Sequence, residues 1–217
     1  MGLAPEGRKP VLAGLALGVL FLVFWVPAGV LFLAGTGLVA WFFRDPERKP
    51  PEDDRIWVSP ADGKVVEVRR ASHPFCGECH YVGIFMSLLD VHVNRMPVDG
   101  RIEYLEYVPG KKWMAFAPKA SEENERFLVG FEGSSGKGMV VQIAGFLARR
   151  IVCSKARGDD LFRGERLGMI KLGSRVDVYM PLAVEPCVRQ GQRVKAGTTG
   201  IGVIENGTKK TQEETSL

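Results

Sequence analysis

The 33 residues from Val11 to Phe43 contain no ionisable side chain, and this apolar run constrains the fold more than any other feature of the chain. As one helix it would extend about 50 Å, which exceeds a hydrocarbon core of about 30 Å. Pro27 lies at its middle with Gly29 close by, so two shorter helices joined near residues 26–29 are expected instead. The sequence therefore predicts a helical hairpin, spanning or re-entrant, that makes residues 1–43 a membrane anchor.

Basic residues flank the run on both sides, with Arg8 and Lys9 before it and Arg44, Arg48 and Lys49 after it. Positive flanks prefer the cytoplasmic side of a membrane, so a hairpin that enters and leaves from that side satisfies both ends. This interpretation places the rest of the chain at the cytoplasmic face of the cell membrane. A single tilted span with an external domain is the alternative. A cleaved signal peptide fits poorly, because its apolar region has about 7 to 15 residues.

The 174 residues after the run are enough for one domain of ordinary size. Residues 44–55 are a charged, proline-rich linker in which neither helix nor sheet is expected. The domain is expected over residues 56–205, and residues 206–217 form a polar, flexible tail. The 29 basic and 25 acidic residues are nearly balanced, which excludes a one-signed stripe for gathering phosphates. We therefore expect no nucleic-acid partner.

Short β-branched segments recur between glycines and prolines through the domain, which indicates a mostly antiparallel sheet. The expected strands are residues 56–58, 65–68, 81–85, 91–93, 101–104, 139–143, 150–153 and 176–179. Only residues 121–126 suggest a helical turn, because a serine precedes acidic residues there. The sequence thus predicts a mainly β (α+β) soluble domain of short, barrel-like strands, preceded by an N-terminal hydrophobic helical hairpin.

Two glycine-bearing segments, residues 59–65 and 188–197, resemble the hairpins of small biotinyl and lipoyl carrier domains. A carrier would need an exposed lysine in such a hairpin, and Lys64 is the sole candidate. This resemblance indicates shape and not activity. It leaves a non-catalytic, barrel-type binding module as one alternative function.

Cys76, Cys79 and His80 form a Cys-x-x-Cys-His sequence, the pattern that attaches c-type haem. Haem attachment would require a domain outside the membrane, against the charge of the flanks. A zinc site would need a fourth ligand, which the sequence does not offer. A membrane-tethered haem protein and a simple pair of loop thiols both stay open, and no metal is expected.

His92 lies in a segment where strand alternation would put Asp90, His92 and Asn94 on one face. Three polar side chains would then converge, as they do in a catalytic cluster. A structural histidine on a solvent-facing strand explains the pattern equally well. This segment alone does not decide between the two interpretations.

Residues 164–181 contain the pair Gly173-Ser174 in the sequence Gly-Glu-Arg-Leu-Gly-Met-Ile-Lys-Leu-Gly-Ser-Arg-Val-Asp-Val-Tyr-Met-Pro. In this setting the pair resembles the cleavage site of the phosphatidylserine decarboxylases, in their short bacterial and archaeal form. Three further segments, 90–97, 119–126 and 140–153, resemble other blocks of that family in the same order. The resemblance extends from Pro60 to Gly197 and covers most of the soluble domain.

The resemblance implies that the chain cuts itself. The hydroxyl of Ser174 would attack the carbonyl of Gly173 and convert the amide to an ester, and glycine leaves room for the strained backbone that this needs. Elimination would release a β chain of residues 1–173. The α chain, residues 174–217, would then begin with a pyruvoyl group derived from Ser174. The working enzyme would consist of both chains of one precursor.

The same resemblance implies the reaction. The pyruvoyl ketone would form a Schiff base with the amine of phosphatidylserine and take up electrons as CO2 leaves, and phosphatidylethanolamine would be released. His92 matches the histidine that assists this step, and an ordinary pKa near 6.5 suits an acid that protonates carbon. Asp62, in Pro-Ala-Asp-Gly, matches the aspartate that promotes self-cleavage.

Arg95 departs from the pattern of the longer family members, which have a second histidine at this position. A permanently charged guanidinium is a poor base. Either His92 serves both steps, which we favour, or Asp62 acts directly or through water while Arg95 fixes a carboxylate. Asp90 and Asn94 are further candidates for supporting roles.

A lipid substrate requires the catalytic face to lie against the bilayer, where basic side chains can meet the phosphate of its head group. Arg149 and Arg150 are candidates for that contact, and a solvated surface charge is the alternative for each. The sequence does not distinguish diacyl from ether lipids. A homo-oligomer is compatible with it.

Overall fold

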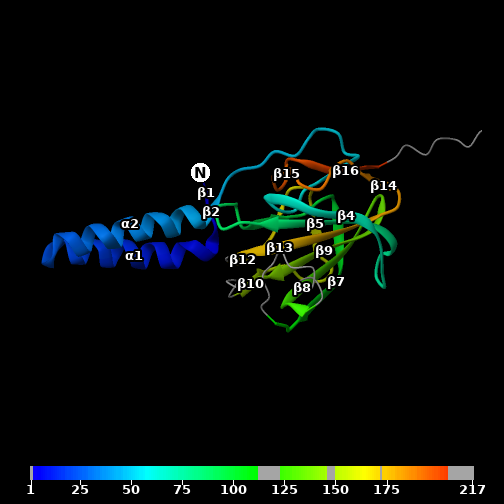
Figure 1. Ribbon diagram of the computed structural model, residues 1–217. Coiled ribbons are helices and arrows are strands. Elements are labelled where there is room, and N and C mark those ends of the chain that lie inside the picture. The colour runs from blue at the N-terminus through cyan, green and yellow to red at the C-terminus, as the bar shows by residue number, and fades with distance from the viewer. Residues whose placement is uncertain (1, 112–122, 146–149, 172, 205–217) are drawn as a thin grey trace, which may run out of the picture.

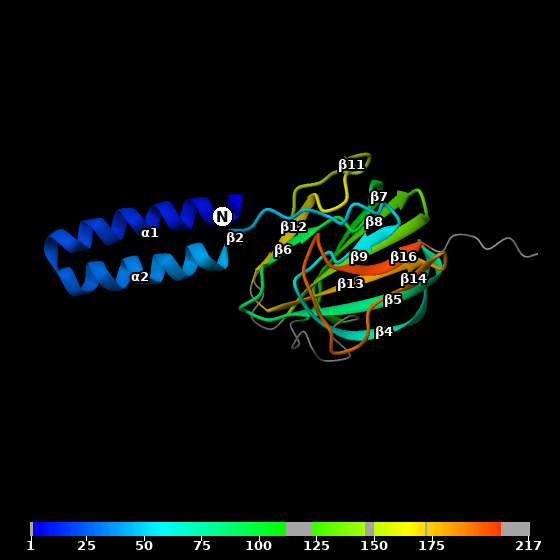
Figure 2. The same ribbon diagram turned by 90° about the horizontal axis from the view of Figure 1, so that it is seen from above.

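The structure is a computed structural model that describes residues 2–111, 123–145, 150–171 and 173–204 (Figure 1). Two helices lie side by side and project from one end of a β domain, as both views show (Figures 1 and 2). The predicted tail, residues 206–217, and the start of the predicted helical turn, residues 121–122, lie outside the described residues. The chain therefore has an apolar helical part and a β part, as the charge pattern predicted.

Helices α1 (Pro5–Phe24) and α2 (Val26–Phe42) form the predicted hairpin. They meet at Trp25, whose extended backbone interrupts the helical path just before the expected break. Pro27 lies in the first turn of α2, where its missing N–H removes no helical hydrogen bond. Within the described residues, α1 is the one helix long and apolar enough to cross a membrane, and α2, at 17 residues, is shorter.

Small residues bring the two helices close together. A Cβ added at Gly14 would lie 2.3 Å from Oγ1 of Thr36, and one added at Gly18 would lie 2.5 Å from Cδ2 of Leu33. Most of the leucine, valine and aromatic side chains of the hairpin point outward and stay exposed. In water such a surface would be costly, so the hairpin is a candidate for membrane association.

The β domain consists of short strands joined mainly in antiparallel pairs. The strands of the chain are β1 (Gly2–Leu3), β2 (Arg44–Asp45), β3 (Ile56–Val58), β4 (Gly63–His73), β5 (Gly77–Met86), β6 (Val93–Arg95), β7 (Gly100–Val108), β8 (Arg126–Gly133), β9 (Gly136–Ala144), β10 (Arg150–Cys153), β11 (Asp160–Leu161), β12 (Arg166–Lys171), β13 (Ser174–Pro181), β14 (Val184–Pro186), β15 (Arg193–Val194) and β16 (Gly200–Ile204). The predicted mainly β fold is confirmed.

An eight-stranded sheet in the order β11-β7-β8-β9-β13-β5-β4-β15 forms the body of the domain. Two three-stranded sheets, β10-β12-β6 and β14-β16-β3, complete it. The main core contains Trp57, Ile84 and Phe131, all fully buried. Strand β13 lies between β9 and β5, so the residue at its start is held on both sides by neighbouring strands.

The two glycine-bearing segments with carrier-like turns come together in space. Arg193 and Val194 pair with Lys64 and Gly63, which joins β15 to the start of β4. The amide of Val65 also donates to the carbonyl of Gln192 at 2.8 Å. The expected hairpin-like shape is therefore built from segments far apart in the sequence.

The start of the linker corrects one expectation. Arg44 and Asp45 form β2, which pairs with Gly2 and Leu3 of β1, although no sheet was expected there. The helical hairpin causes this pairing, because it brings the residues before α1 next to those after α2. Residues 46–55 form neither helix nor strand, as expected, and run along the domain (Figure 2). The guanidinium of Arg163 holds this stretch through the carbonyls of Pro51 and Asp53.

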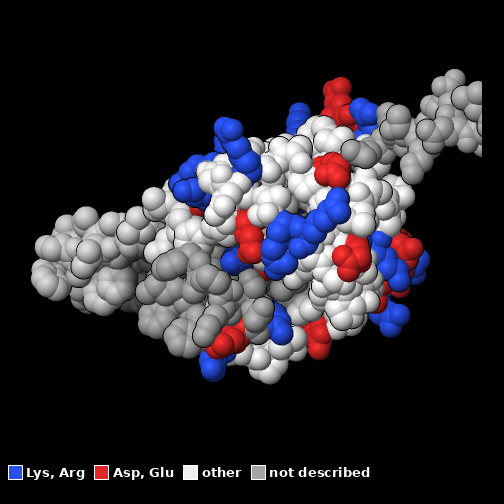
Figure 3. All heavy atoms as spheres, turned by 45° about the vertical axis from the view of Figure 1, so that its right-hand side comes forward, with Lys and Arg blue, Asp and Glu red and all other residues white. Residues whose placement is uncertain are grey.

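Charged side chains of both signs share the surface of the domain. Figure 3 shows acidic groups beside the basic groups across the face that it presents. Such mixing fits the nearly balanced charge count of the sequence.

Candidate active site

Ser174 is the first residue of β13 and is fully buried. It pairs with Met86 of β5 on one side and with Ala144 of β9 on the other. Its hydroxyl donates to the sulfur of Met86 at 3.3 Å. A serine enclosed between two strands, with a sulfur as its one acceptor among the described residues, is unlike a solvated surface serine.

Gly173 precedes it with φ of +55°, a left-handed conformation that favours glycine. Apart from its chain neighbours, no atom of the described residues lies within 4 Å of a Cβ added there, so the backbone angle and not space explains the glycine. The carbonyl oxygen of Gly173 accepts a hydrogen bond from the amide of Gly145 at 3.1 Å. A donor on this carbonyl would stabilise negative charge on its oxygen if the carbon were attacked.

A buried polar chain leads away from Ser174. The Nδ2 of Asn94 lies 3.7 Å from the same Met86 sulfur, and the Oδ1 of Asn94 accepts from Nε2 of Gln142 at 2.8 Å. Asn94 and Gln142 are both fully buried. The predicted residues Ser174 and Asn94 are thus brought together across Met86.

His92 is fully buried two residues before Asn94. Its Nδ1 lies 2.9 Å from the carbonyl oxygen of Asp90. A carbonyl can only accept, so Nδ1 carries the proton and the neutral ring has its lone pair on Nε2. Nε2 is buried without a hydrogen-bond partner among the residues that the structure describes. It is the natural proton acceptor of the region.

The helical hairpin contacts His92 directly. The ring of Phe42, the last residue of α2, lies 4.6 Å from the imidazole between ring centroids. Burial lowers the pKa of His92 to about 4, and the charge of Arg44 adds to this, although the hydrogen bond and charge of Asp90 oppose it. An ordinary pKa near 6.5 was expected; the difference arises because the ring is out of water. His92 is therefore neutral at neutral pH.

This lowered pKa predicts how stability depends on pH. The unfolded chain takes up a proton near pH 6.5 and the folded chain near pH 4, so the unfolded state binds more protons between them. The contribution of neutral His92 to the free energy of unfolding is fully present above pH 6.5. It is lost as the pH falls to 4, by roughly 3 kcal/mol in all. We expect His92→Gln to remove it, measured by thermal unfolding in detergent. Both proteins should carry Ser174→Ala so that the chain stays whole, and identical pH dependence would contradict the prediction.

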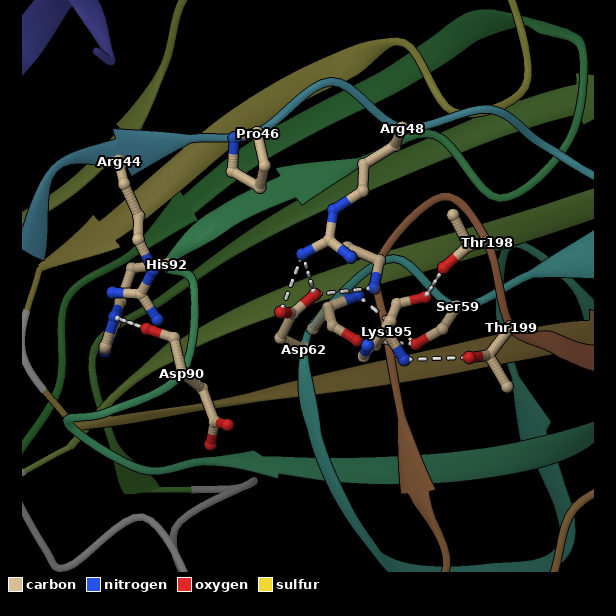
Figure 4. A network of polar contacts seen from close by, with 12 residues as sticks. Arg44, Pro46, Arg48, Ser59, Asp62, Asp90, His92, Lys195, Thr198 and Thr199 are labelled. Atoms are coloured by element: carbon tan, nitrogen blue, oxygen red, sulfur yellow. Dashed lines mark hydrogen bonds and ion pairs between the residues drawn. The ribbon is translucent and has the colours of Figure 1, made fainter. Parts of the chain in front are cut away.

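The expectation that Asp90, His92 and Asn94 share one strand face is wrong for Asp90. Strand β6 begins only at Val93, and Asp90 lies in a turn where its Oδ2 accepts from the amide and hydroxyl of Ser87 at 2.8 and 2.7 Å. Figure 4 shows the carboxylate turned away from His92, which Asp90 meets through its backbone oxygen. Asp90 therefore sets the orientation of the imidazole by its main chain.

Asp62 is buried and is held by Arg48 of the linker. The Nη2 of Arg48 lies 2.9 Å from Oδ2 and 3.2 Å from Oδ1, and the amide of Ala196 donates to Oδ1 at 2.8 Å (Figure 4). Among the described residues, its hydrogen bonds go to these two groups and not to His92 or Ser174. In the described part of the chain, Asp62 therefore makes no direct hydrogen bond to the other two predicted residues.

Arg95 holds a carboxylate, but not that of Asp62. Its Nη2 donates to Asp45 at 2.5 Å and to the carbonyl of Pro46 at 3.1 Å, and its Nη1 donates to the carbonyl of Gly164 at 2.9 Å. Arg95 therefore fastens the linker beside the site, while Arg48 of that linker pairs with Asp62.

The two proposed head-group arginines are not equally placed. Arg150 begins β10 and is exposed, and it pairs with Lys171 of β12. Arg149 lies outside the described residues.

The Cys-x-x-Cys-His sequence lies at the hairpin between β4 and β5. Cys79 is buried inside β5, where its thiol donates to the carbonyl of Ala71, and burial raises the pKa of Cys76 to about 12. His80 is also buried and lies 3.3 Å from Glu185. Among the described residues no group of three or more histidines, cysteines or acidic residues is placed to hold a metal. The motif thus contributes to the packing of a hairpin.

Phe42 and Gln142 of this region were not predicted as site residues, and the pairing of Arg48 with Asp62 was not predicted either. Gln142 had a signal, since it is the one polar residue in an otherwise apolar expected strand, 139–143. Arg48 and Phe42 act across long sequence separations, for which the local sequence carries no signal.

Comparison with known proteins gives one consistent result. A family model described as phosphatidylserine decarboxylase matches residues 36–202. Many relatives match the chain, among them three that bear the name phosphatidylserine decarboxylase proenzyme. The one from Symbiobacterium thermophilum is 48% identical over 205 residues, 92% of this chain and 94% of its own. The one from Chlorobium luteolum is 45% identical, covering 92% and 98%. The one from Chlorobium phaeobacteroides is 47% identical, covering 82% and 87%.

Proposed function

The chain belongs to the phosphatidylserine decarboxylase family and is a phosphatidylserine decarboxylase, and we propose that it works through a pyruvoyl group that it makes from its own Ser174. The product would be phosphatidylethanolamine, with CO2 released. One observation carries the proposal: Gly173 and Ser174 meet at the start of a central strand with the serine fully buried. The word proenzyme in the names of the relatives agrees with a chain that is processed.

Self-cleavage would start with attack of the Ser174 hydroxyl on the carbonyl carbon of Gly173. The carbon–nitrogen bond breaks as the ester forms, and the hydroxyl proton passes to a base. The amide of Gly145, which donates to the Gly173 oxygen, would stabilise the charge that develops there. Loss of the α-proton of residue 174 then expels the carboxylate of Gly173. The dehydroalanine that is left at residue 174 is then hydrolysed: water adds, ammonia leaves, and a pyruvoyl group remains.

The residues around Ser174 fit the pyruvoyl group that would replace it. The group is no larger than serine, and the position is enclosed by β5 and β9, which excludes bulk water. Met86, whose sulfur now contacts the hydroxyl, would pack against it. When present, the ketone supplies the electron sink that decarboxylation of an amino acid needs.

His92 would move the protons of both stages. Its Nε2 is neutral and without a partner among the described residues, so it can accept a proton from the ammonium group of the incoming lipid. It can return that proton to the α-carbon once CO2 has left. Burial makes the neutral imidazole the resting state and the imidazolium a strong acid, so the low pKa favours return of the proton to carbon and opposes its uptake from the ammonium group.

Asp62 and Arg48 would support self-cleavage from one side of the site. Arg48 and the amide of Ala196 fix the carboxylate in one orientation (Figure 4). The rigid pairing suits a carboxylate that acts through an intervening water and not through large movement. Arg95 supports the same arrangement indirectly, because its contact with Asp45 holds the linker that carries Arg48.

The helical hairpin would hold the site at the cytoplasmic face of the membrane, as its basic flanks favour. Three contacts at the base of the hairpin support a close attachment of the site to the hairpin. Phe42 packs on His92, the Arg44 guanidinium lies 4.1 Å from the ring of Trp41, and Arg44 donates to the carbonyl of Leu89. The exposed side chain of Leu89 then lies close to the head groups. A phospholipid would reach the site without leaving the bilayer.

Intact-mass measurement of the purified protein tests the proposal. We expect two chains, the smaller containing the 44 residues from 174 to 217 with a pyruvoyl block that reacts with hydroxylamine. The same preparation should convert phosphatidylserine in vesicles to phosphatidylethanolamine. A single chain of full mass that survives long incubation, without a reactive ketone, would overturn the proposal and favour a binding module. Haem absorbance would favour the haem protein.

A further inference from the structure

The cut that the proposed function requires removes one covalent restraint on the position of residue 174. Our inference rests on that proposed function. Before the cut, the peptide bond to Gly173 holds this residue from one side. Afterwards residue 174 is a chain end, and the contact of its side chain with Met86 is weak. Catalysis nevertheless needs the new group held in one position, so the restraint must come from the pairing of β13 with β5 and β9 and from the residues after it in the chain.

Arg175, the next residue, is held by an extensive set of polar contacts. Its side chain is 3% exposed, and its Nε donates to Oδ1 of Asp177 at 2.6 Å. Its Nη2 donates to Glu67 at 3.0 Å and to the hydroxyl of Tyr81 at 2.5 Å. These three partners lie on β13, β4 and β5, so one guanidinium ties three adjacent strands together.

Gly83 provides the space that this network needs. It pairs with Asp177 across β5 and β13. A Cβ at position 83 would lie 2.5 Å from Nη2 of Arg175 and 3.2 Å from Oδ1 of Asp177. The guanidinium therefore lies over a glycine in the middle of the sheet, where a side chain would displace it.

The network is on the opposite face of the sheet from the reacting group. Successive strand residues point to opposite faces, so Ser174 faces the core side and Arg175 the other. Although burial opposes the charge, Asp177, Tyr81 and Glu67 raise the pKa of Arg175 above its ordinary value. Arg175 thus stays charged, and removal of one member of a buried ion pair is strongly unfavourable. It can fix the backbone of residue 175 without occupying the space of the substrate.

We propose that Arg175 is a positioning residue that clamps the newly formed N-terminal end of the α chain, so that the group at residue 174 stays in place after the cut. Before the cut this role is redundant with the intact peptide bond. The clamp therefore makes a difference mainly in the processed enzyme, which separates it from an ordinary stabilising contact.

Arg175→Gln tests the clamp in cut and uncut protein. In the cut enzyme we expect kcat to fall about tenfold or more with little change in KM, since a misplaced reacting group slows turnover more than lipid binding. Hydrogen exchange of peptides from residues 175–181 should become faster. In the uncut Ser174→Ala background the same substitution should change this exchange much less. Arg175→Lys should restore part of the rate, because it keeps the charge but not the forked geometry.

Arg163→Gln is the matched control, since it removes a guanidinium of similar burial whose contacts hold the linker. It should leave exchange at residues 175–181 unchanged. If Arg175→Gln does not fold, Glu67→Gln removes one partner from the half-exposed end of the network and should give a smaller effect of the same kind. Equal changes in cut and uncut protein, or an unchanged kcat, would overturn the clamp. Failure of the proposed function would instead appear earlier, as a parent protein that never splits.

Discussion

Ser174→Ala yields a single uncut chain of 217 residues without decarboxylase activity. Alanine cannot attack the carbonyl of Gly173, so neither the ester nor the group derived from it can form. Activity should fall by at least about a thousandfold, since without an electron sink the site can only bind the lipid. Intact-mass measurement and phosphatidylethanolamine formation in vesicles report the two losses separately.

The matched control is Ser135→Ala. Ser135 is also a serine next to a glycine, but it lies in the turn between β8 and β9 and accepts a hydrogen bond from Trp57 at 3.1 Å. This variant should split fully and keep its activity, with a modest loss of stability from the hydrogen bond, about 1 kcal/mol. A Ser174→Ala chain that still splits at the same place, or that retains turnover, would contradict the assignment of Ser174.

The architecture was predictable where a local pattern decides it. Pro27, in the middle of an uncharged run, cannot continue a straight helix, so a hairpin was predicted and confirmed. The recurrence of β-branched segments likewise predicted the antiparallel domain. Strand β8 (Arg126–Gly133) was missed, although its centre is apolar, because glycines interrupt the pattern there. Its pairing with β7 and β9 supplies the stability that the local sequence does not indicate.

The candidate site was less predictable because its contacts join distant segments. Asp90 and His92 were expected on one strand face, but the side chain of Asp90 bonds to Ser87 and holds a turn. Local side-chain bonds of this kind compete with strand formation, and the alternation of residue types does not reveal them. The pairs Arg48–Asp62 and Phe42–His92 arise from the docking of the linker and the anchor on the domain.

These two pairs connect the helical hairpin and the linker after it to the two candidate catalytic residues His92 and Asp62. Phe42 ends α2 and shields the imidazole, and Arg48 comes shortly after it and fixes Asp62. Between them, Asp45 pairs with both Arg95 and Arg166. If the helical hairpin and the linker were no longer docked on the domain, His92 would lose its contact with Phe42 and Asp62 would lose its pair with Arg48. The helical hairpin therefore shapes the candidate site, in addition to the role at the membrane that we propose for it.

His92→Ala should lose both self-cleavage and decarboxylation. Proton transfer by a positioned histidine contributes about 10² to 10⁴ in rate, so losses of this size are expected in each step. The imidazole is suited to both, because its Nε2 is neutral, buried and without a partner among the described residues. Cleavage is followed by intact mass over time. Turnover is expressed per reactive ketone, counted with hydroxylamine, so that slow cleavage is not mistaken for slow chemistry.

His73→Ala is the matched control, since His73 ends β4 and packs on Tyr179, away from the site. It should split and turn over like the parent. Asp62→Asn provides the contrast: it should slow cleavage while turnover per ketone stays near the parent value. If His92→Ala splits at the parent rate but does not decarboxylate, His92 serves turnover alone. The base for cleavage would then be Asp62, fixed by Arg48, because it is the buried carboxylate held at the edge of the site.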